Sequence, residues 1–464
     1  MISDPKVFWL LGTLALAAIW FFPAGCAGDD DDDDGSGDSG DDDDTGPSVD
    51  GVDCEDDNCF VTGVILEDLT MTADKNWILR GGVFIGNDVD PVVLTIEPGT
   101  QVFGETSTKG MLVITRGAKI MAEGTADAPI VFSSSKYEGE RARGDWGGII
   151  INGRAPVNNC LGDEIEYCES LGEGATGEFG GSDPEDDSGI MRYVRVEFAG
   201  RLVSPENELN GIAFQGVGSG GVFEYIQVHM NKDDGIEFFG GTANIGHVVV
   251  TGAADDGFDW TDGWTGKAQF VVIQQYAGGG DQGIEADNNA ENNVATPRSR
   301  PTLSNFTIVG QGDDFSDFGI LLREGTGGNL HNMLVWGWDE AALSIMHRET
   351  YRAAWDEDAA ALTGVMILTD SIIWNNNSDF AEDEIEEPFS VVAFFNALND
   401  GNSEVDPALG DPRNQTDPDF APAEGSPALS GGNTPSDPFF DEVSFIGAIG
   451  ADDWTKGWTT TAEN

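Results

Sequence analysis

The chain has 464 residues, of which 84 are acidic and 22 basic, so its formal net charge at pH 7 is −62. This balance excludes a protein that binds the nucleic-acid backbone, because such binding needs a basic surface. It favours instead a strongly solvated surface, an affinity for cations or a basic partner. The 63 glycines and many short β-branched runs predict an all-β chain in which turns separate short strands.

The chain begins with an apolar segment. Residues 1–25 contain one basic side chain, Lys6, and nineteen consecutive uncharged residues at 7–25, after which comes Cys26. This arrangement resembles a bacterial lipoprotein signal peptide, which is cleaved before a cysteine that then carries lipid. With Ala27 rather than an aspartate next to it, the resemblance implies an outer-membrane protein facing the cell exterior. The alternative is an uncleaved membrane anchor, because the uncharged run is long enough to span a bilayer.

An acidic segment follows, and we predict that residues 26–59 form a disordered tether. Residues 29–59 contain sixteen acidic residues and no basic one, with aspartate runs separated by glycine and serine. Such a segment cannot bury apolar surface, and its charges repel one another, so it should stay extended. Its role would be to hold the folded part, residues 60–464, away from the membrane.

The remaining cysteines form two close pairs in the sequence. The predicted export of the chain permits disulfides, so we pair Cys54 with Cys59 and Cys160 with Cys168. A zinc site is disfavoured, because the spacing is wrong and no histidine lies nearby.

From Phe60 onward, short alternating runs end at glycine or Pro-Gly turns, a pattern typical of strands. Clear examples are VVLTIEPGTQVFG at 92–104 and GMLVITRGAKIMAEGTADAPIVFSS at 110–134. Apart from a weak helix candidate at 350–362, no amphipathic helix of three turns is predicted.

One phrase recurs in the middle of the chain. DGIE at 234–237 returns as DGFD at 256–259, QGIE at 282–285 and FGIL at 318–321, at intervals of 22, 26 and 36 residues. A period of about 22 residues, with insertions confined to turns, indicates a solenoid of stacked rungs. Short strands without a helix in each repeat favour a parallel β-helix, which we expect to close with a C-terminal cap near 440–464.

This register predicts which side chains face the interior, because side chains alternate along a strand. Two inward columns are expected, Ile236, Phe258, Ile284 and Ile320 in one and Phe238, Trp260, Ala286 and Leu322 in the other. The acidic residues between these columns should face outward.

The recurring acids are the candidate metal ligands, namely Asp234, Glu237, Asp256, Asp259 and Glu285. Equivalent positions on adjacent rungs lie roughly 4.8 Å apart. Carboxylates at that spacing repel, so they need a cation, a basic neighbour or a raised pKa. Calcium is the expected ion, because it binds several hard oxygen ligands. The alternative is a solvated acidic face that binds no ion.

Several stretches resemble a known family. LTIEPGTQV, AEGTADAPIVFSS and GDWGGIIING resemble the opening rungs of bacterial right-handed parallel β-helix proteins, which have the pectin-lyase-like fold. DWTDGWTGK, GIEADNN and GILLREGTGG resemble a narrower group of surface lipoproteins that includes leptospiral outer-membrane lipoproteins. The resemblance covers roughly residues 75–459. It implies the fold and a surface location, and it supplies no catalytic residues.

The heptapeptide DWTDGWT at 259–265 has a near copy, DWTKGWT, at 453–459. Aromatic rings suit carbohydrate and peptide partners, although a tryptophan in a β-helix is more often part of the core. We assign Trp260 to the core, because it belongs to an inward column, and we name Trp264 as a candidate ligand-binding residue.

Two functions are weighed. A polysaccharide lyase or glycoside hydrolase would act through the acidic face, since retaining hydrolysis uses two carboxyl groups about 5 Å apart. A calcium-dependent lyase also needs a basic residue, and neither Lys232 nor Arg323 lies in a recognisable motif. We therefore favour a non-catalytic binding or surface structural role. Its partners would be the outer membrane, through the lipid anchor, and a glycan or an outer-membrane protein.

Overall fold

The computed structural model describes residues 49–160, 168–202, 208–312, 315–356, 358–359, 361–382, 389–397 and 401–464. Cys26, the predicted signal peptide and most of the predicted tether lie outside these residues. Within the described ranges, no helix is both long enough and apolar enough to cross a membrane.

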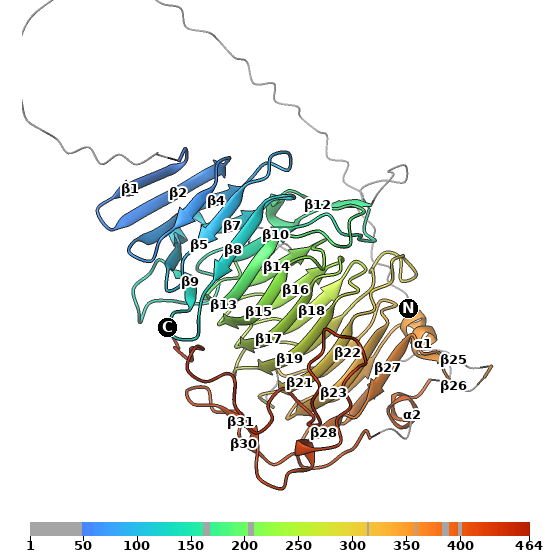
Figure 1. The fold of residues 1–464 in the computed structure, drawn as a ribbon. Helices are drawn as coiled ribbons and strands as arrows, with labels where there is room; N and C mark the ends of the chain where they lie inside the picture. Colours follow the sequence, from blue (N-terminus) through green and yellow to red (C-terminus); the bar gives the residue numbers. More distant parts are fainter. Residues whose placement is uncertain are drawn as a thin grey trace, which may run out of the picture. The chain divides into compact units, whose positions relative to one another are not determined.

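The predicted right-handed parallel β-helix is confirmed. A 25-stranded sheet stacks along one axis, in sequence order from β1 to β29 (Figure 1). The N-terminal rungs confirm the strands predicted at 92–104 and 110–134. They consist of β1 (Val52–Glu55), β2 (Asn58–Ile65), β3 (Leu69–Met71), β4 (Asn76–Ile85), β5 (Val93–Ile96), β6 (Gln101–Gly104), β7 (Met111–Ile114), β8 (Lys119–Glu123), β9 (Ile130–Ser134) and β10 (Ile149–Asn152).

The first strand pair is an antiparallel hairpin at the N-terminal end of the stack. In it, β1 pairs with β2, and Cys54 lies opposite Cys59, with which it forms a disulfide of S–S distance 2.04 Å. The second predicted disulfide, Cys160–Cys168, is also present. Described strands therefore begin at Val52, earlier than the boundary predicted at Phe60.

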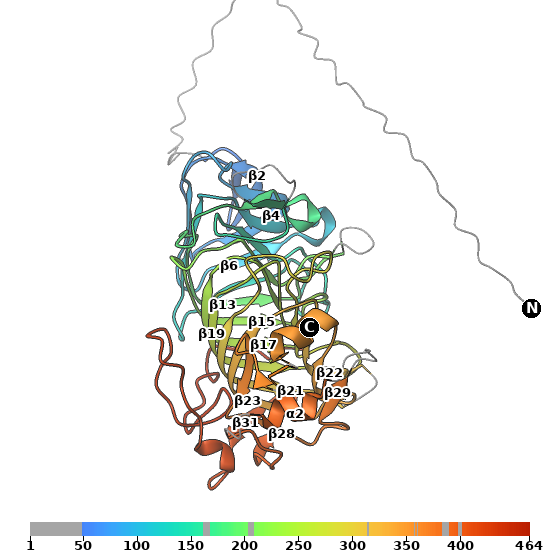
Figure 2. The same cartoon turned by 90° about the vertical axis from the view of Figure 1, so that its right-hand side faces the viewer.

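The middle of the β-helix consists of two ladders of parallel strands. The short strands form one ladder, β14 (Ile212–Gln215), β16 (Ile236–Phe239), β18 (Phe258–Thr261), β20 (Ile284–Ala286) and β22 (Phe318–Leu322). The long strands form the other, β13 (Gly189–Glu197), β15 (Val222–His229), β17 (Asn244–Thr251), β19 (Lys267–Gln274), β21 (Thr302–Val309) and β23 (Gly328–Trp336). Figure 2 shows β13 and β19 on one side of the stack and β22 and β29 on the other.

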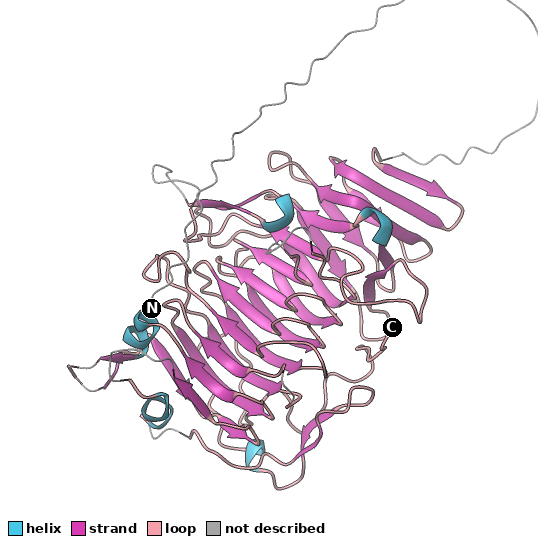
Figure 3. Cartoon of the chain, turned by 180° about the vertical axis from the view of Figure 1, so that it is seen from behind, coloured by secondary structure: helices cyan, strands magenta, loops and turns pink. Residues whose placement is uncertain are grey.

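The remaining elements are short; four of them are strands that continue the stacked sheet, and the others lie outside that sheet (Figure 3). They comprise β11 (Glu169–Leu171), β12 (Glu178–Gly180), β24 (Ala341–Ile345), α1 (Arg348–Ala354), β25 (Trp355–Asp356), β26 (Ala361–Leu362), β27 (Met366–Thr369), β28 (Ile372–Trp374), β29 (Phe380–Glu382), α2 (Val391–Asn396), β30 (Leu409–Asp411), β31 (Asp419–Pro422) and the single-turn 3-10 helices η1 (Thr106–Thr108), η2 (Glu173–Ala175) and η3 (Pro427–Leu429). Helix α1 covers part of the weak candidate at 350–362.

Both inward columns have the predicted register. Ile236 pairs with Phe258, Phe258 with Ile284, and Ile284 with Ile320. All eight column residues are at most 2% exposed. Burial of each large apolar side chain stabilises the fold by about 1.5–3 kcal/mol. A one-residue slip would bring the acids into this core, so burial also fixes the register.

The long strands bend at one position per rung, where the backbone takes a left-handed conformation. Tyr193, Tyr225 and His247 have φ of 50°, 54° and 54° at this bend, and their rings stack on the outside at centroid distances of 4.4 and 4.3 Å. Left-handed backbone costs non-glycine residues of order 1–3 kcal/mol, which the stacking of the rings partly offsets.

The C-terminal strap, residues 407–464, runs along the outside of the long-strand ladder instead of closing its end (Figure 1). Asn305 on β21 donates to the carbonyl oxygen of Phe445 at 2.9 Å. Gln227 on β15, three rungs nearer the N-terminus, donates to the carbonyl oxygen of Thr460 at 2.8 Å. The segment 440–464, predicted to be a terminal cap, is therefore a lateral cover. It replaces solvent over the apolar outward residues of these strands.

Candidate cation site on the acidic ladder

The recurring acids form one continuous row, which we call the acidic ladder: Asp234, Glu237, Asp256, Asp259 and Glu285. Glu237 on β16 pairs with Asp259 on β18, which pairs with Glu285 on β20. The flanking positions are Ala213 on β14 and Leu321 on β22. Three consecutive rungs therefore carry the acids at equivalent outward positions, and apolar residues bound them on both sides.

The first acid of each phrase joins its rung to the next one. The backbone N–H of Asp256 donates to Asp234 Oδ1 at 3.0 Å, and that of Gln282 donates to Asp256 Oδ1 at 2.6 Å. At the following rung, the N–H of Phe318 donates to Gln282 Oε1 at 3.0 Å. The neutral amide of Gln282 makes the same bond as the aspartates, so this contact does not explain their charge.

The acidic ladder points away from the apolar core, yet it is buried. The exposed fractions of Asp234, Glu237, Asp256 and Asp259 are 7%, 8%, 3% and 8%. Ionised carboxylates are almost never buried to this extent unless they are paired. These four residues therefore do not form a solvated face.

The donors available to these buried carboxylates are few. Asn210 Nδ2 donates to Glu237 Oε2 at 2.5 Å, and Arg323 Nη2 forms an ion pair with Glu285 Oε2 at 2.8 Å. Asp259 Oδ1 is buried and accepts no hydrogen bond within the described part of the chain. A buried acceptor left without a donor costs about 1–3 kcal/mol or more when charged, so Asp259 is the member of the ladder that the described residues satisfy least.

The pKa values reflect this environment. Burial first, and then the neighbouring carboxylates, raise the pKa of Asp234, Glu237, Asp256 and Asp259 well above the ordinary range. Burial also raises the pKa of Glu285, to about 7, against the opposing charge of Arg323. Without a cation, these groups keep their protons at pH values where exposed carboxyls are ionised.

The carboxylate oxygens are close enough to share an ion. In each of two groups, Asp234–Glu237–Asp259 and Asp256–Asp259–Glu285, one oxygen per residue lies within 4.8 Å of the others. Two oxygens on opposite sides of a calcium ion lie roughly 4.6–5.2 Å apart, twice the usual Ca–O distance. Both groups contain Asp259, and only the second contains an acid that is paired with arginine.

A second row of acids, which was not predicted from the sequence, lies beside the ladder. Asp233, Asp255 and Asp281 immediately precede the corner residues of the three rungs, and their oxygens approach the ladder within 4.8 Å in two further groups. The doublet Asp-Asp at 233–234 and 255–256 was visible in the repeated phrase. Its first member could have been recognised, because the same register applies to both residues.

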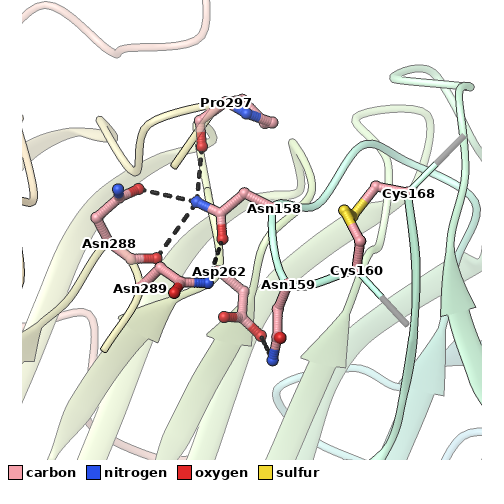
Figure 4. The surroundings of a disulfide bond; sticks show 8 residues. All are labelled: Asn158, Asn159, Cys160, Cys168, Asp262, Asn288, Asn289 and Pro297. Atoms are coloured by element: carbon pink, nitrogen blue, oxygen red, sulfur yellow. Dashed lines mark hydrogen bonds between the residues drawn. A yellow bond between two sulfur atoms is a disulfide. The ribbon is translucent and has the colours of Figure 1, made fainter. Parts of the chain in front are cut away.

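Side-chain hydrogen bonds join the segment after β10 to residues of later rungs (Figure 4). Asn158 Nδ2 donates to Asn288 Oδ1 at 2.9 Å and to the carbonyl oxygen of Pro297 at 2.8 Å. Asn159 Nδ2 donates to Asp262 Oδ2 at 3.3 Å. The Cys160–Cys168 disulfide follows directly in the sequence.

Other predicted site residues have structural contacts. Trp264 is fully buried; it stacks on Phe238 at 4.1 Å and donates from Nε1 to the carbonyl oxygen of Ala243 at 3.1 Å. This corrects the prediction of Trp264 as a ligand-binding residue, because a ring packed in the core offers no face to a ligand. Lys232 Nζ pairs with Glu208 at 2.8 Å.

Comparison with known proteins agrees with the fold. The family model described as a pectate-lyase like beta helix domain matches residues 63–459, and the chain belongs to this family. No match was found among curated proteins or among solved structures.

Proposed function

We propose that this protein is a surface-exposed, lipid-anchored β-helix of the outer membrane with a non-catalytic binding or structural role, and that its acidic ladder binds calcium. The observation that carries the calcium proposal is the unpartnered Asp259 Oδ1, buried at the centre of five carboxylates. A buried charge needs a counter-charge, and the ion pair of Arg323 with Glu285 supplies only one.

Calcium suits this site better than a proton or sodium. A divalent ion replaces several protons at once, and calcium accepts six to eight oxygen ligands in flexible geometry. The group Asp234–Glu237–Asp259 lacks a basic partner among the described residues, whereas Glu285 in the other group is neutralised by Arg323. We therefore place the tightest ion in the first group, next to the unpartnered oxygen of Asp259.

Thermal unfolding of the full chain tests calcium binding. Calcium chloride at millimolar concentration should raise Tm more than sodium chloride at the same ionic strength, since a ligand specific to the folded state stabilises it by mass action. Asp256→Asn combined with Asp259→Asn should greatly reduce that difference, because it removes carboxyl groups from both groups of the ladder, whereas Asp452→Asn on the exposed strap should preserve it. Equal effects of both salts on the parent would contradict the proposal.

The location is supported by the apolar segment and Cys26. Metabolic labelling with a radioactive fatty acid should mark the parent, and Cys26→Ser should abolish the label and leave the precursor uncleaved. Labelled Cys26→Ser protein would refute the anchor. An attached β-helix with a cation-dependent face is suited to bind a glycan or an outer-membrane protein, and these are the partners we propose.

A polysaccharide lyase or glycoside hydrolase is the second candidate, favoured by one observation. Arg323 lies against the acids, with Nε 3.0 Å from Asp287 and Nη2 2.8 Å from Glu285. However, both ion pairs hold this guanidinium in place. Depolymerisation of a panel of acidic and neutral polysaccharides by the parent, lost in Arg323→Gln, would establish an enzyme; no product from any of them would favour the binding role.

A further inference from the structure

A second set of acids runs beside the acidic ladder, on its outer side. We call Asp233, Asp255 and Asp281 the outer row. The group Asp233–Asp234–Asp255 and the group Asp255–Asp256–Asp281 each bring three carboxylate oxygens within 4.8 Å of one another. The same upper limit of 4.8 Å holds for the groups of the acidic ladder, so the outer row meets the same spacing requirement for a shared cation.

The arrangement is repeated at two rung interfaces. Each interface has one inner group and one outer group, and the corner aspartate, Asp234 or Asp256, belongs to both. Carboxylates can bind cations through either or both oxygens, so a corner aspartate can bridge two ions. At the next rung the corner residue is Gln282, and the pattern of shared carboxylates ends.

Asp233 provides a second observation, independent of the spacing between the oxygens. Its side chain is 9% exposed, and no hydrogen bond or ion pair to it occurs among the described residues. The neighbouring ammonium of Lys232 forms an ion pair with Glu208 instead. A carboxylate that is nine-tenths buried and has no donor is expensive to ionise unless a cation coordinates it.

We propose that the outer row is a second cation site, in which Asp233, Asp255 and Asp281 bind divalent metal, calcium by preference, together with the corner aspartates. Each rung interface thus holds an inner and an outer ion bridged by one aspartate. This inference extends the proposed calcium binding but does not rest on it, since the outer groups contain neither Asp259 nor Glu237.

The two rows can be separated by single substitutions. Asp255 belongs to both outer groups and to no inner group, whereas Asp259 belongs to both inner groups and to no outer group. Asp255→Asn and Asp259→Asn are therefore matched variants: each replaces one aspartate by asparagine, the first in the outer row and the second in the acidic ladder. Asp452→Asn, on the exposed strap, is the control for a general loss of charge.

The test is equilibrium dialysis of the full chain against radioactive calcium chloride, which counts bound ions. The parent should bind at least two ions per chain, Asp255→Asn should lose at least one, and Asp452→Asn should bind as many as the parent. An Asp255→Asn protein that binds as many ions as the parent overturns the outer row. If only Asp259→Asn binds as the parent does, the outer row stands and the proposed inner site fails.

Circular dichroism spectra in EDTA show whether each variant is folded. Asparagine preserves the shape of aspartate and removes a repulsive charge, so both variants should fold without calcium. If Asp255→Asn does not fold, Asp233→Asn removes the buried unpartnered carboxylate at one interface and should also lose bound calcium. Unchanged binding by a folded Asp233→Asn would then overturn the proposal.

Discussion

The two sides of this β-helix bury their outward residues in different ways. Along the long strands, the C-terminal strap supplies both apolar and hydrogen-bonding partners: Val249 and Val272 pack with Ile449 and Trp458, and Gln227 exchanges two hydrogen bonds with Thr460. Along the short strands, the acidic ladder is equally buried, yet its donors are Asn210, Arg323 and the backbone of the next rung. The comparison teaches that the strap supplies apolar and polar partners for the long strands, whereas the described residues supply few donors for the buried carboxyl groups of the acidic side.

The strap side should lose the most stability when its cover is disrupted. Trp458 is 2% exposed and stands edge-on to Tyr193 at 5.7 Å. Trp458→Ala should destabilise the protein by about 3–5 kcal/mol, the range for a large buried aromatic. Trp374→Ala, at a site that is 37% exposed, should cost much less. Guanidinium unfolding measures both, and equal losses would show that the strap does not stabilise the stack.

A substitution on the acidic side should raise the stability of the protein, whereas a substitution on the strap side should lower it. In EDTA, folding near pH 7 must either protonate the Asp259 carboxyl or hold its charge among like charges, because its pKa is raised. Asp259→Asn removes this cost and should stabilise the protein by on the order of 1–4 kcal/mol, the scale of the repulsion between neighbouring carboxylates. Asp452→Asn is the exposed control, expected to change stability little. Destabilisation by Asp259→Asn in EDTA would mean that this carboxylate has a partner within the folded chain, and the contrast between the two sides would fail.

The stability of the two sides should also depend on pH with opposite signs. Burial raises the pKa of Glu285 to about 7, so between about pH 4 and 7 the folded state binds more protons than the unfolded state. The acidic side therefore loses stability as pH rises through this range. Burial lowers the pKa of His229, which lies under the strap, to about 4. Between about pH 4 and 6.5 the unfolded state binds more protons at this histidine, so the strap side loses stability as pH falls.

Two variants separate these opposing slopes in melting curves recorded in EDTA from about pH 4 to 7. Asp259→Asn should weaken the decline in Tm toward neutral pH, because one raised pKa is removed from the group. His229→Gln should weaken the decline toward acid pH. The same change of slope in both variants would contradict the assignment of opposite signs to the two sides.

Much of the fold could be predicted from the repeated phrase. The spacing of Ile236, Phe258 and Ile284 sets the register, because one rung lies above another and alternation decides which residues enter the core. The two disulfides followed from the proximity of their cysteines in the sequence. These features depend on local pattern, which a single sequence displays.

The parts that could not be predicted depend on contacts between distant segments. Alternation predicts that Asp259 points outward, but its burial depends on loops elsewhere in the chain. The strap contacts residues such as Gln227, more than two hundred positions earlier, and no periodic pattern in the sequence predicts these contacts. Likewise, the two copies of DWTxGWT differ in role, since Trp264 packs inside the stack and Trp458 packs against its outer surface.

The central claim is that the acidic side lacks a cation that the chain itself does not supply. Crystals of the full chain grown with calcium and soaked with terbium, a calcium substitute with strong anomalous scattering, test it most directly. The account predicts an anomalous peak about 2.3–2.6 Å from carboxylate oxygens of Asp234, Glu237 and Asp259. A map without a peak there, with a protein donor on Asp259 Oδ1 instead, would contradict it.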